Sequence, residues 1–144
     1  MQDQFGKVKE GIMRLYRIIH LSVLILIFSV SFAIASFEIP AYVYTIDQLN
    51  VAQEKARIYD SQIVFLYSNK DTKCPLATNA SKNILGQFRD NAVIVYICSE
   101  DWAKVPQIVR KAIKSPQAGR FIPKTIVVNS DITQVVSIIP YKRP

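Results

Sequence analysis

Histidine, glycine and cysteine are scarce in this sequence: its 144 residues include one histidine, four glycines and two cysteines. His20 has no second metal ligand near it, so no metal site is expected. The carboxylates do not form an acid–base pair, no serine–histidine arrangement is visible, and the glycines make no phosphate-binding loop. These shortages argue against metal-dependent, hydrolytic and nucleotide-binding functions, and no cofactor is predicted.

Charged side chains are missing from Ile18 to Phe37, a run of 20 residues. This length reaches the threshold for a helix that spans a bilayer. The next lysine or arginine after the run is Lys55, whereas four basic residues precede it, namely Lys7, Lys9, Arg14 and Arg17. The positive-inside rule therefore places the N-terminus in the cytoplasm and the rest of the chain across the membrane.

The same segment also fits a secretory signal. If synthesis began at Met13, residues 21–32 would form the apolar region, and residues 33–35 would form an Ala-x-Ala cleavage site. Both outcomes stay open: an inner membrane anchor with a periplasmic domain, or a periplasmic or secreted domain cleaved near Ala35–Ser36. In either case residues 1–36 form a hydrophobic N-terminal region, and residues 37–144 form an exported domain.

The net charge of +7 is spread along the chain, and residues 36–144 keep fourteen basic residues against nine acidic ones. Six of the basic residues cluster late in the chain: Lys104, Arg110, Lys111, Lys114, Arg120 and Lys124. They lack the repeated interleaving of aromatic residues that single-stranded nucleic acid binding uses, so nucleic acid is not a predicted partner. The cluster predicts a solvated face, with anionic lipid headgroups as the alternative.

The stretch from Gln62 to Leu85 organises the rest of the domain. Its short apolar run, residues 63–67, predicts a buried strand that ends in a polar loop. Pro75 suits a first helical turn, and apolar residues then recur at helical spacing as far as Phe88. This pattern places Cys74 at a helix N-terminus, where backbone N–H groups favour a thiolate.

Further elements are expected on either side of this stretch. A capping box at Thr45 and Gln48 predicts a helix that ends near Asp60, and Pro106 predicts an irregular start for the third helix. Apolar runs without alternation predict strands buried on both faces in a parallel sheet, whereas a tight turn makes the last two strands antiparallel. The expected strands are 41–44, 63–67, 92–98, 124–129 and 133–139. This order predicts an α/β domain with a mixed sheet flanked by helices.

Two motifs in this order resemble the thioredoxin-like superfamily over roughly residues 41–139. The motif Cys74-Pro75-Leu76-Ala77 is similar to the Cys-Pro-x-Cys of exported disulfide oxidoreductases, at the same strand-to-helix junction. The motif Ile122-Pro123-Lys124-Thr125 is similar to the family's Ile-Pro-Thr. The resemblance implies that the bond before Pro123 is cis and that Ile122 and Pro123 face the active site and its substrate.

The chain departs from the family pattern in two places. Ala77 replaces the resolving cysteine, so the family's dithiol cycle cannot run within this motif, and the protein is more readily interpreted as a non-enzyme. The family's last helix also has no counterpart after the final strand. Its loss should leave apolar surface that needs a protein partner, a membrane or a second copy.

The two cysteines leave alternatives open. Cys74 is either a reactive monothiol, aided by Lys70 and Lys73, or a remnant in a scaffold that has lost its chemistry. Cys98 ends the neighbouring strand and could act as a resolving thiol. The resemblance implies a separation somewhat too large for a disulfide, so a buried free thiol at Cys98 is the expected state.

The final strand is apolar on both faces. Strict alternation predicts Val135 and Ile139 on one side and Val136 and Ile138 on the other, and one of these pairs is the expected interface. We therefore interpret the sequence as a non-catalytic thioredoxin-like domain that serves as a structural or assembly subunit of an envelope complex. The alternative is a periplasmic thiol–disulfide oxidoreductase that uses Cys74, alone or with Cys98.

Overall fold

The computed structural model describes residues 37–69, 71–72 and 74–142. The predicted transmembrane or signal segment lies outside these residues, as do Lys70 and Lys73. In the described part, the elements are β1 (Tyr44–Thr45), η1 (Ile46–Gln48), α2 (Leu49–Ile58), β2 (Gln62–Tyr67), α3 (Pro75–Phe88), β3 (Ala92–Ile97), η2 (Ser99–Lys104), α4 (Gln107–Lys114), η3 (Pro116–Ala118), β4 (Lys124–Val128) and β5 (Val135–Pro140).

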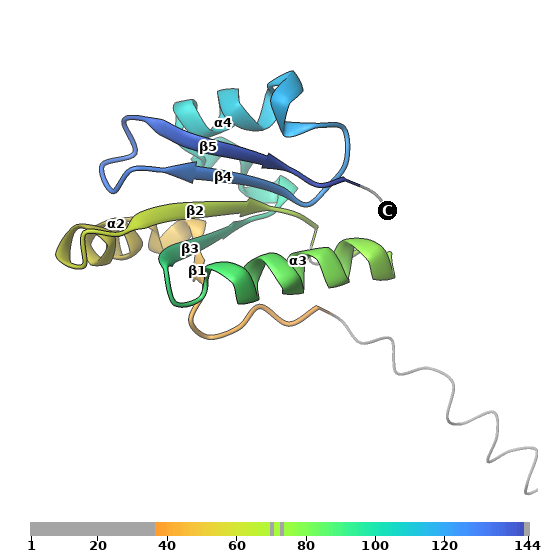
Figure 1. Cartoon of the computed structure of the whole chain (residues 1–144), viewed down its shortest axis with the longest axis horizontal. Helices are drawn as coiled ribbons and strands as arrows, with labels where there is room; N and C mark the ends of the chain where they lie inside the picture. The colour runs from red at the N-terminus through yellow and green to blue at the C-terminus, as the bar shows by residue number, and fades with distance from the viewer. Residues whose placement is uncertain (1–36, 70, 73, 143–144) are drawn as a thin grey trace, which may run out of the picture. The chain divides into compact units, whose positions relative to one another are not determined.

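The five strands form one mixed sheet in the order β1-β3-β2-β4-β5. Strand β3 pairs in parallel with both β1 and β2, while β4 pairs antiparallel with both β2 and β5. The prediction of buried parallel strands followed by an antiparallel pair is therefore confirmed. Helices α3 and α4 lie on opposite faces of this sheet (Figure 1).

Alternate residues of the central strands form two apolar clusters, one on each face of the sheet. The first cluster joins side chains such as Phe65 and Ile126 to α2 and α4. The second cluster joins side chains such as Leu66 and Tyr96 to α3 and to Phe37. Because both faces are buried, β2 and β3 have the continuous apolar composition that identified them as strands.

The predicted capping box is present, but a short 3-10 helix, η1, lies between it and α2. The backbone N–H of Thr45 donates to Gln48 Oε1 at 3.1 Å, as the capping box requires. These residues cap the single turn of η1, and α2 continues from it at Leu49. Pro106 likewise separates η2 from α4, which confirms the irregular start expected for the third helix.

Strand β1 is shorter and later than predicted. The sequence pattern favoured residues 41–44, but only Tyr44 and Thr45 pair with β3. The backbone N–H of Val43 instead donates to the carbonyl oxygen of Pro40 at 3.0 Å. This turn occupies the backbone just before the strand, so Val43 packs into the second cluster without joining the sheet, while Ala41 and Tyr42 are exposed.

The predicted alternation of side chains along β5 is wrong because the strand contains a bulge. Val128 pairs with Val135 and Val127 with Ser137, so one residue of β5 is left over between them. As a result Val135 and Ile138, which were expected on opposite sides, both pack against the first cluster. Val136 and Ile139 are the exposed pair, at 49% and 38%.

Candidate functional site

Cys74 is the N-cap residue of α3 and is exposed to solvent. The loop before it is shaped by short polar bonds: Asn69 Oδ1 accepts the N–H of Asp71 at 2.9 Å, and Thr72 Oγ1 accepts the N–H of Cys74 at 3.2 Å. Pro75 occupies the first helical turn, where a missing N–H leaves no bond unmade. The predicted strand, loop and helix around this cysteine are thus confirmed.

Cys74 opens onto a pocket of about 270 Å³, which we name the Cys74 pocket. Its walls come from the start of α3, from the segment before β4 and from the segment after β5: Thr72, Cys74, Leu76, Ala77, Phe121, Ile122 and Tyr141. Ile122 therefore lines the same pocket as Cys74, although 48 positions separate them in the chain. The Ile122–Pro123 peptide bond is cis, as the resemblance implies.

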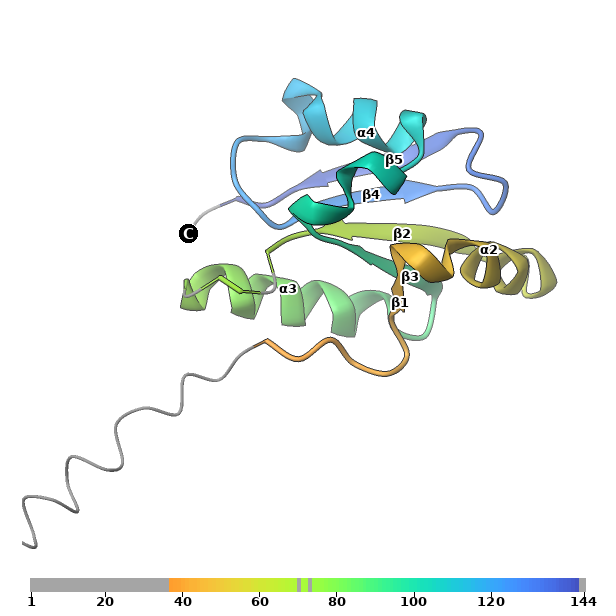
Figure 2. The ribbon, with the colours of Figure 1, turned by 180° about the vertical axis from the view of Figure 1, so that it is seen from behind.

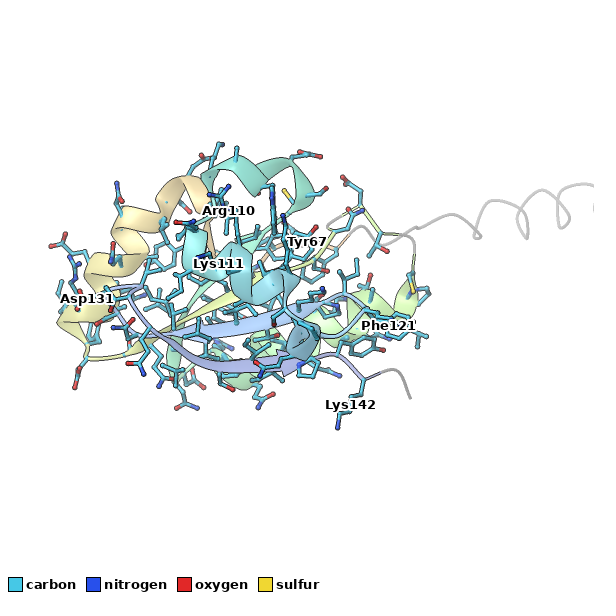
Figure 3. All side chains as sticks on the ribbon, turned by 90° about the horizontal axis from the view of Figure 1, so that it is seen from above. Tyr67, Arg110, Lys111, Phe121, Asp131 and Lys142 are labelled. Carbon is cyan, nitrogen blue, oxygen red and sulfur yellow. The ribbon has the colours of Figure 1, made fainter. Side chains whose placement is uncertain are left out.

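The walls of the Cys74 pocket are mostly apolar. Phe121 and Leu76 are exposed at its rim, at 49% and 42%, whereas Ala77 is buried in the helix at 5%. Phe121 lies at one end of the domain, with Asp131 at the other (Figure 3). An exposed thiol surrounded by apolar side chains is suited to contact with an apolar protein segment.

Cys98 has a different environment from Cys74. It is a half-buried free thiol at the N-cap of η2, and its Sγ–H donates to Asp101 Oδ2 at 2.8 Å. Burial raises the pKa of the Cys98 thiol, and the hydrogen bond to the Asp101 carboxylate raises it further. The free state expected for Cys98 is confirmed, although its burial is only partial. It does not line the Cys74 pocket.

Buried polar groups lie on the α3 face of the sheet. The hydroxyls of Ser68 and Ser81 form a buried hydrogen bond of 3.2 Å between the end of β2 and α3. The hydroxyl of Tyr96 is buried and has no hydrogen-bond partner among the described residues. Burial raises the pKa of Tyr96 to about 12, while the nearby Ser68 hydroxyl acts in the opposite direction.

Through its two motifs, sequence reasoning identified Cys74, Leu76, Ala77 and Ile122, but it missed Thr72, Phe121 and Tyr141. Pro123, which was also expected to face the site, is buried and does not line the pocket. Phe121 and Tyr141 carry no motif of their own. Their one visible indication was position, because Phe121 precedes the Ile122–Pro123 step and Tyr141 follows the last strand. The four residues proposed as an interface, Val135, Val136, Ile138 and Ile139, divide into a half-buried and an exposed pair and line no part of the pocket.

Within residues 37–142, apart from 70 and 73, no three histidine, cysteine or acidic side chains gather as metal ligands would. In the same residues, no helix has the length and apolar character needed to cross a bilayer. Residues 18–36 of the uncharged run, His20 included, lie outside this part.

Comparison with known proteins gives no match: no family model, no curated protein and no solved structure resembles the chain closely enough to be matched.

Proposed function

We propose that this chain is an exported thioredoxin-like domain that holds a protein partner as a structural or assembly subunit of an envelope complex. The strand order β1-β3-β2-β4-β5 and the meeting of Cys74 with Ile122 support the thioredoxin-like interpretation. The uncharged run from Ile18 to Phe37, preceded by basic residues, supports export through an anchor or a cleaved signal.

The Cys74 pocket is the observation that carries this proposal. It presents a concave, apolar surface at the end of the sheet where the family binds its substrates. Ala77 stands where a second thiol would release a bound cysteine, so the pocket retains the binding surface without the dithiol exchange. A site of this kind binds a partner instead of oxidising or reducing it in repeated cycles.

Co-purification from detergent-solubilised membranes tests the proposal. We expect Leu76→Asp and Phe121→Asp to remove the partner, because each places a charge on the apolar rim. Gln117→Asp, on the exposed surface of η3 outside the pocket, is the matched control and should keep the partner bound. Retention of the partner by both rim variants, with the domain folded by circular dichroism, would place the binding surface elsewhere.

The exposed thiol of Cys74 favours one alternative function, a monothiol oxidoreductase acting alone or with Cys98. In that mechanism the Cys74 thiolate attacks a partner disulfide, forms a mixed disulfide and releases the partner's other sulfur as a thiolate. Cys74→Ser separates the two functions. If the chain is an assembly subunit, the variant keeps its partner with or without reductant. If the chain is an oxidoreductase, the wild type forms a mixed disulfide that reductant breaks, and the variant forms none.

A further inference from the structure

One flank of α2 carries apolar side chains that the core does not use. Val51 and Ile58 are 59% and 70% exposed, and they lie seven residues apart, which is two helical turns or about 10.5 Å. Ala52 and Ala56 provide the buried face of the same helix. On the other flank Arg57 forms an ion pair of 2.8 Å with Asp131. The apolar flank therefore faces neither the core nor the polar surface next to β5.

This flank forms one wall of a groove of about 410 Å³ beside the short edge strand β1. The groove is lined by Tyr44, Val51, Glu54, Lys55, Ile58 and Tyr59. Helix α2 and the start of α3 lie toward opposite ends of the domain (Figure 2), so the groove is separate from the Cys74 pocket. Isolated exposed apolar residues are common on protein surfaces, but here two of them lie on one side of α2, two turns apart and beside the same groove.

The charges on the flank fit a second copy of the same helix. At 100° per residue, Val51 and Ile58 form the centre of a seam, with Glu54 on one side of it and Lys55 on the other. Lys55 Nζ lies 5.4 Å from the centroid of the Tyr44 ring, at the edge of the same groove. In a parallel, two-fold pair of helices, the residues on one side of the seam face those on the other side of the partner. Glu54 then lies opposite the partner subunit's Lys55, and the same contact occurs twice.

We propose that the chain forms a homodimer through parallel packing of α2 against the partner subunit's α2, with Val51 and Ile58 as the apolar seam. An antiparallel pair would bring Glu54 against the partner's Glu54 and Lys55 against the partner's Lys55, so the charges select the parallel arrangement. This surface lies outside the proposed partner site. A ten-residue helix makes a small interface, so the dimer exchanges with monomer instead of being permanent.

Charge variants of the full-length chain, purified in mild detergent, test this dimer by sedimentation velocity over a range of concentrations. We expect wild-type protein to show a concentration-dependent monomer–dimer equilibrium. Glu54→Lys places lysine against the partner's Lys55, and Lys55→Glu places glutamate against the partner's Glu54. Each variant alone should dimerise at least tenfold more weakly, because two attractive contacts become repulsive.

An equimolar mixture of the two variants is the decisive sample, because its mixed dimer regains two opposite-charge contacts. We expect dimerisation in the mixture to return at least to the wild-type level. Glu100→Lys, which makes the same charge change on η2, is the control and should leave the equilibrium unchanged. The proposal is overturned if the wild type stays monomeric, if Glu54→Lys dimerises like the wild type, or if the mixture does not recover.

Discussion

Ala77 is the single residue that separates this site from a dithiol motif. It follows Cys74 by three positions at the start of α3 and lines the same pocket. We predict that Ala77→Cys creates insulin-reducing turnover at least tenfold above the wild type, because a thiol one turn along can resolve a mixed disulfide. Ala77→Ser, of similar size but without a thiol, is the control. Equal turnover in the two variants, or turnover in the wild type, would contradict the prediction.

The buried hydroxyl of Tyr96 makes one contribution to the pH dependence of the domain's stability at alkaline pH. Its pKa is raised from 10.0 to about 12, mainly by burial. Below pH 10 the tyrosine is neutral in both the folded and the unfolded state, so the free energy of unfolding keeps its full value. Between pH 10 and about 12 the tyrosine ionises only in the unfolded chain, so the free energy of unfolding falls as the pH rises. Two pKa units correspond to roughly 2.7 kcal/mol of unfolding free energy.

We predict that Tyr96→Phe reduces the loss of stability between pH 10 and pH 12 by the share that comes from this tyrosine, as measured by urea unfolding between pH 7 and pH 12. At pH 7 the variant should be as stable as the wild type or more stable by about 1 kcal/mol, because it removes a buried hydroxyl that has no hydrogen bond within the described residues. Tyr59→Phe, at an exposed tyrosine, is the control. A large loss of stability in Tyr96→Phe at pH 7 would mean that the hydroxyl is hydrogen-bonded in solution.

At the scale of the element, β5 separates two kinds of apolar side chain. Val136 and Ile139 are exposed, whereas Val135 and Ile138 pack against the first cluster. We predict that Val136→Asp with Ile139→Asp, at a second contact outside the Cys74 pocket, weakens co-purification of the same partner and leaves the circular dichroism spectrum unchanged. Burying these two side chains in an interface is worth about 1.5–3 kcal/mol each.

The other pair of β5 gives the matched comparison. Val135→Asp with Ile138→Asp places charges against the core, so we expect this variant to lower the unfolding free energy measured in urea. If Val136→Asp with Ile139→Asp leaves the complex intact, the uncovered face of β5 is not the interface. This experiment is independent of the rim variants at Leu76 and Phe121, because the two exposed residues of β5 line no part of the Cys74 pocket.

At the scale of the whole molecule, the sequence predicted most elements but few of the contacts between them. Strands β2 and β3 were recognisable because burial on both faces requires an unbroken apolar run. The bulge in β5 was not recognisable, because it is a shift in backbone pairing that changes no residue type. The pocket was predictable only at its two motifs, since Phe121 and Tyr141 approach Cys74 through tertiary packing.

Both edges of the sheet are poor templates for another strand. At one edge β1 has only two residues, and at the other β5 contains a bulge and ends in Pro140, which has no N–H to donate. Features of this kind keep sheets from extending into neighbouring molecules. The domain can therefore expose Val136 and Ile139 without inviting aggregation along its backbone. A partner that binds here must do so through side chains and not by strand addition.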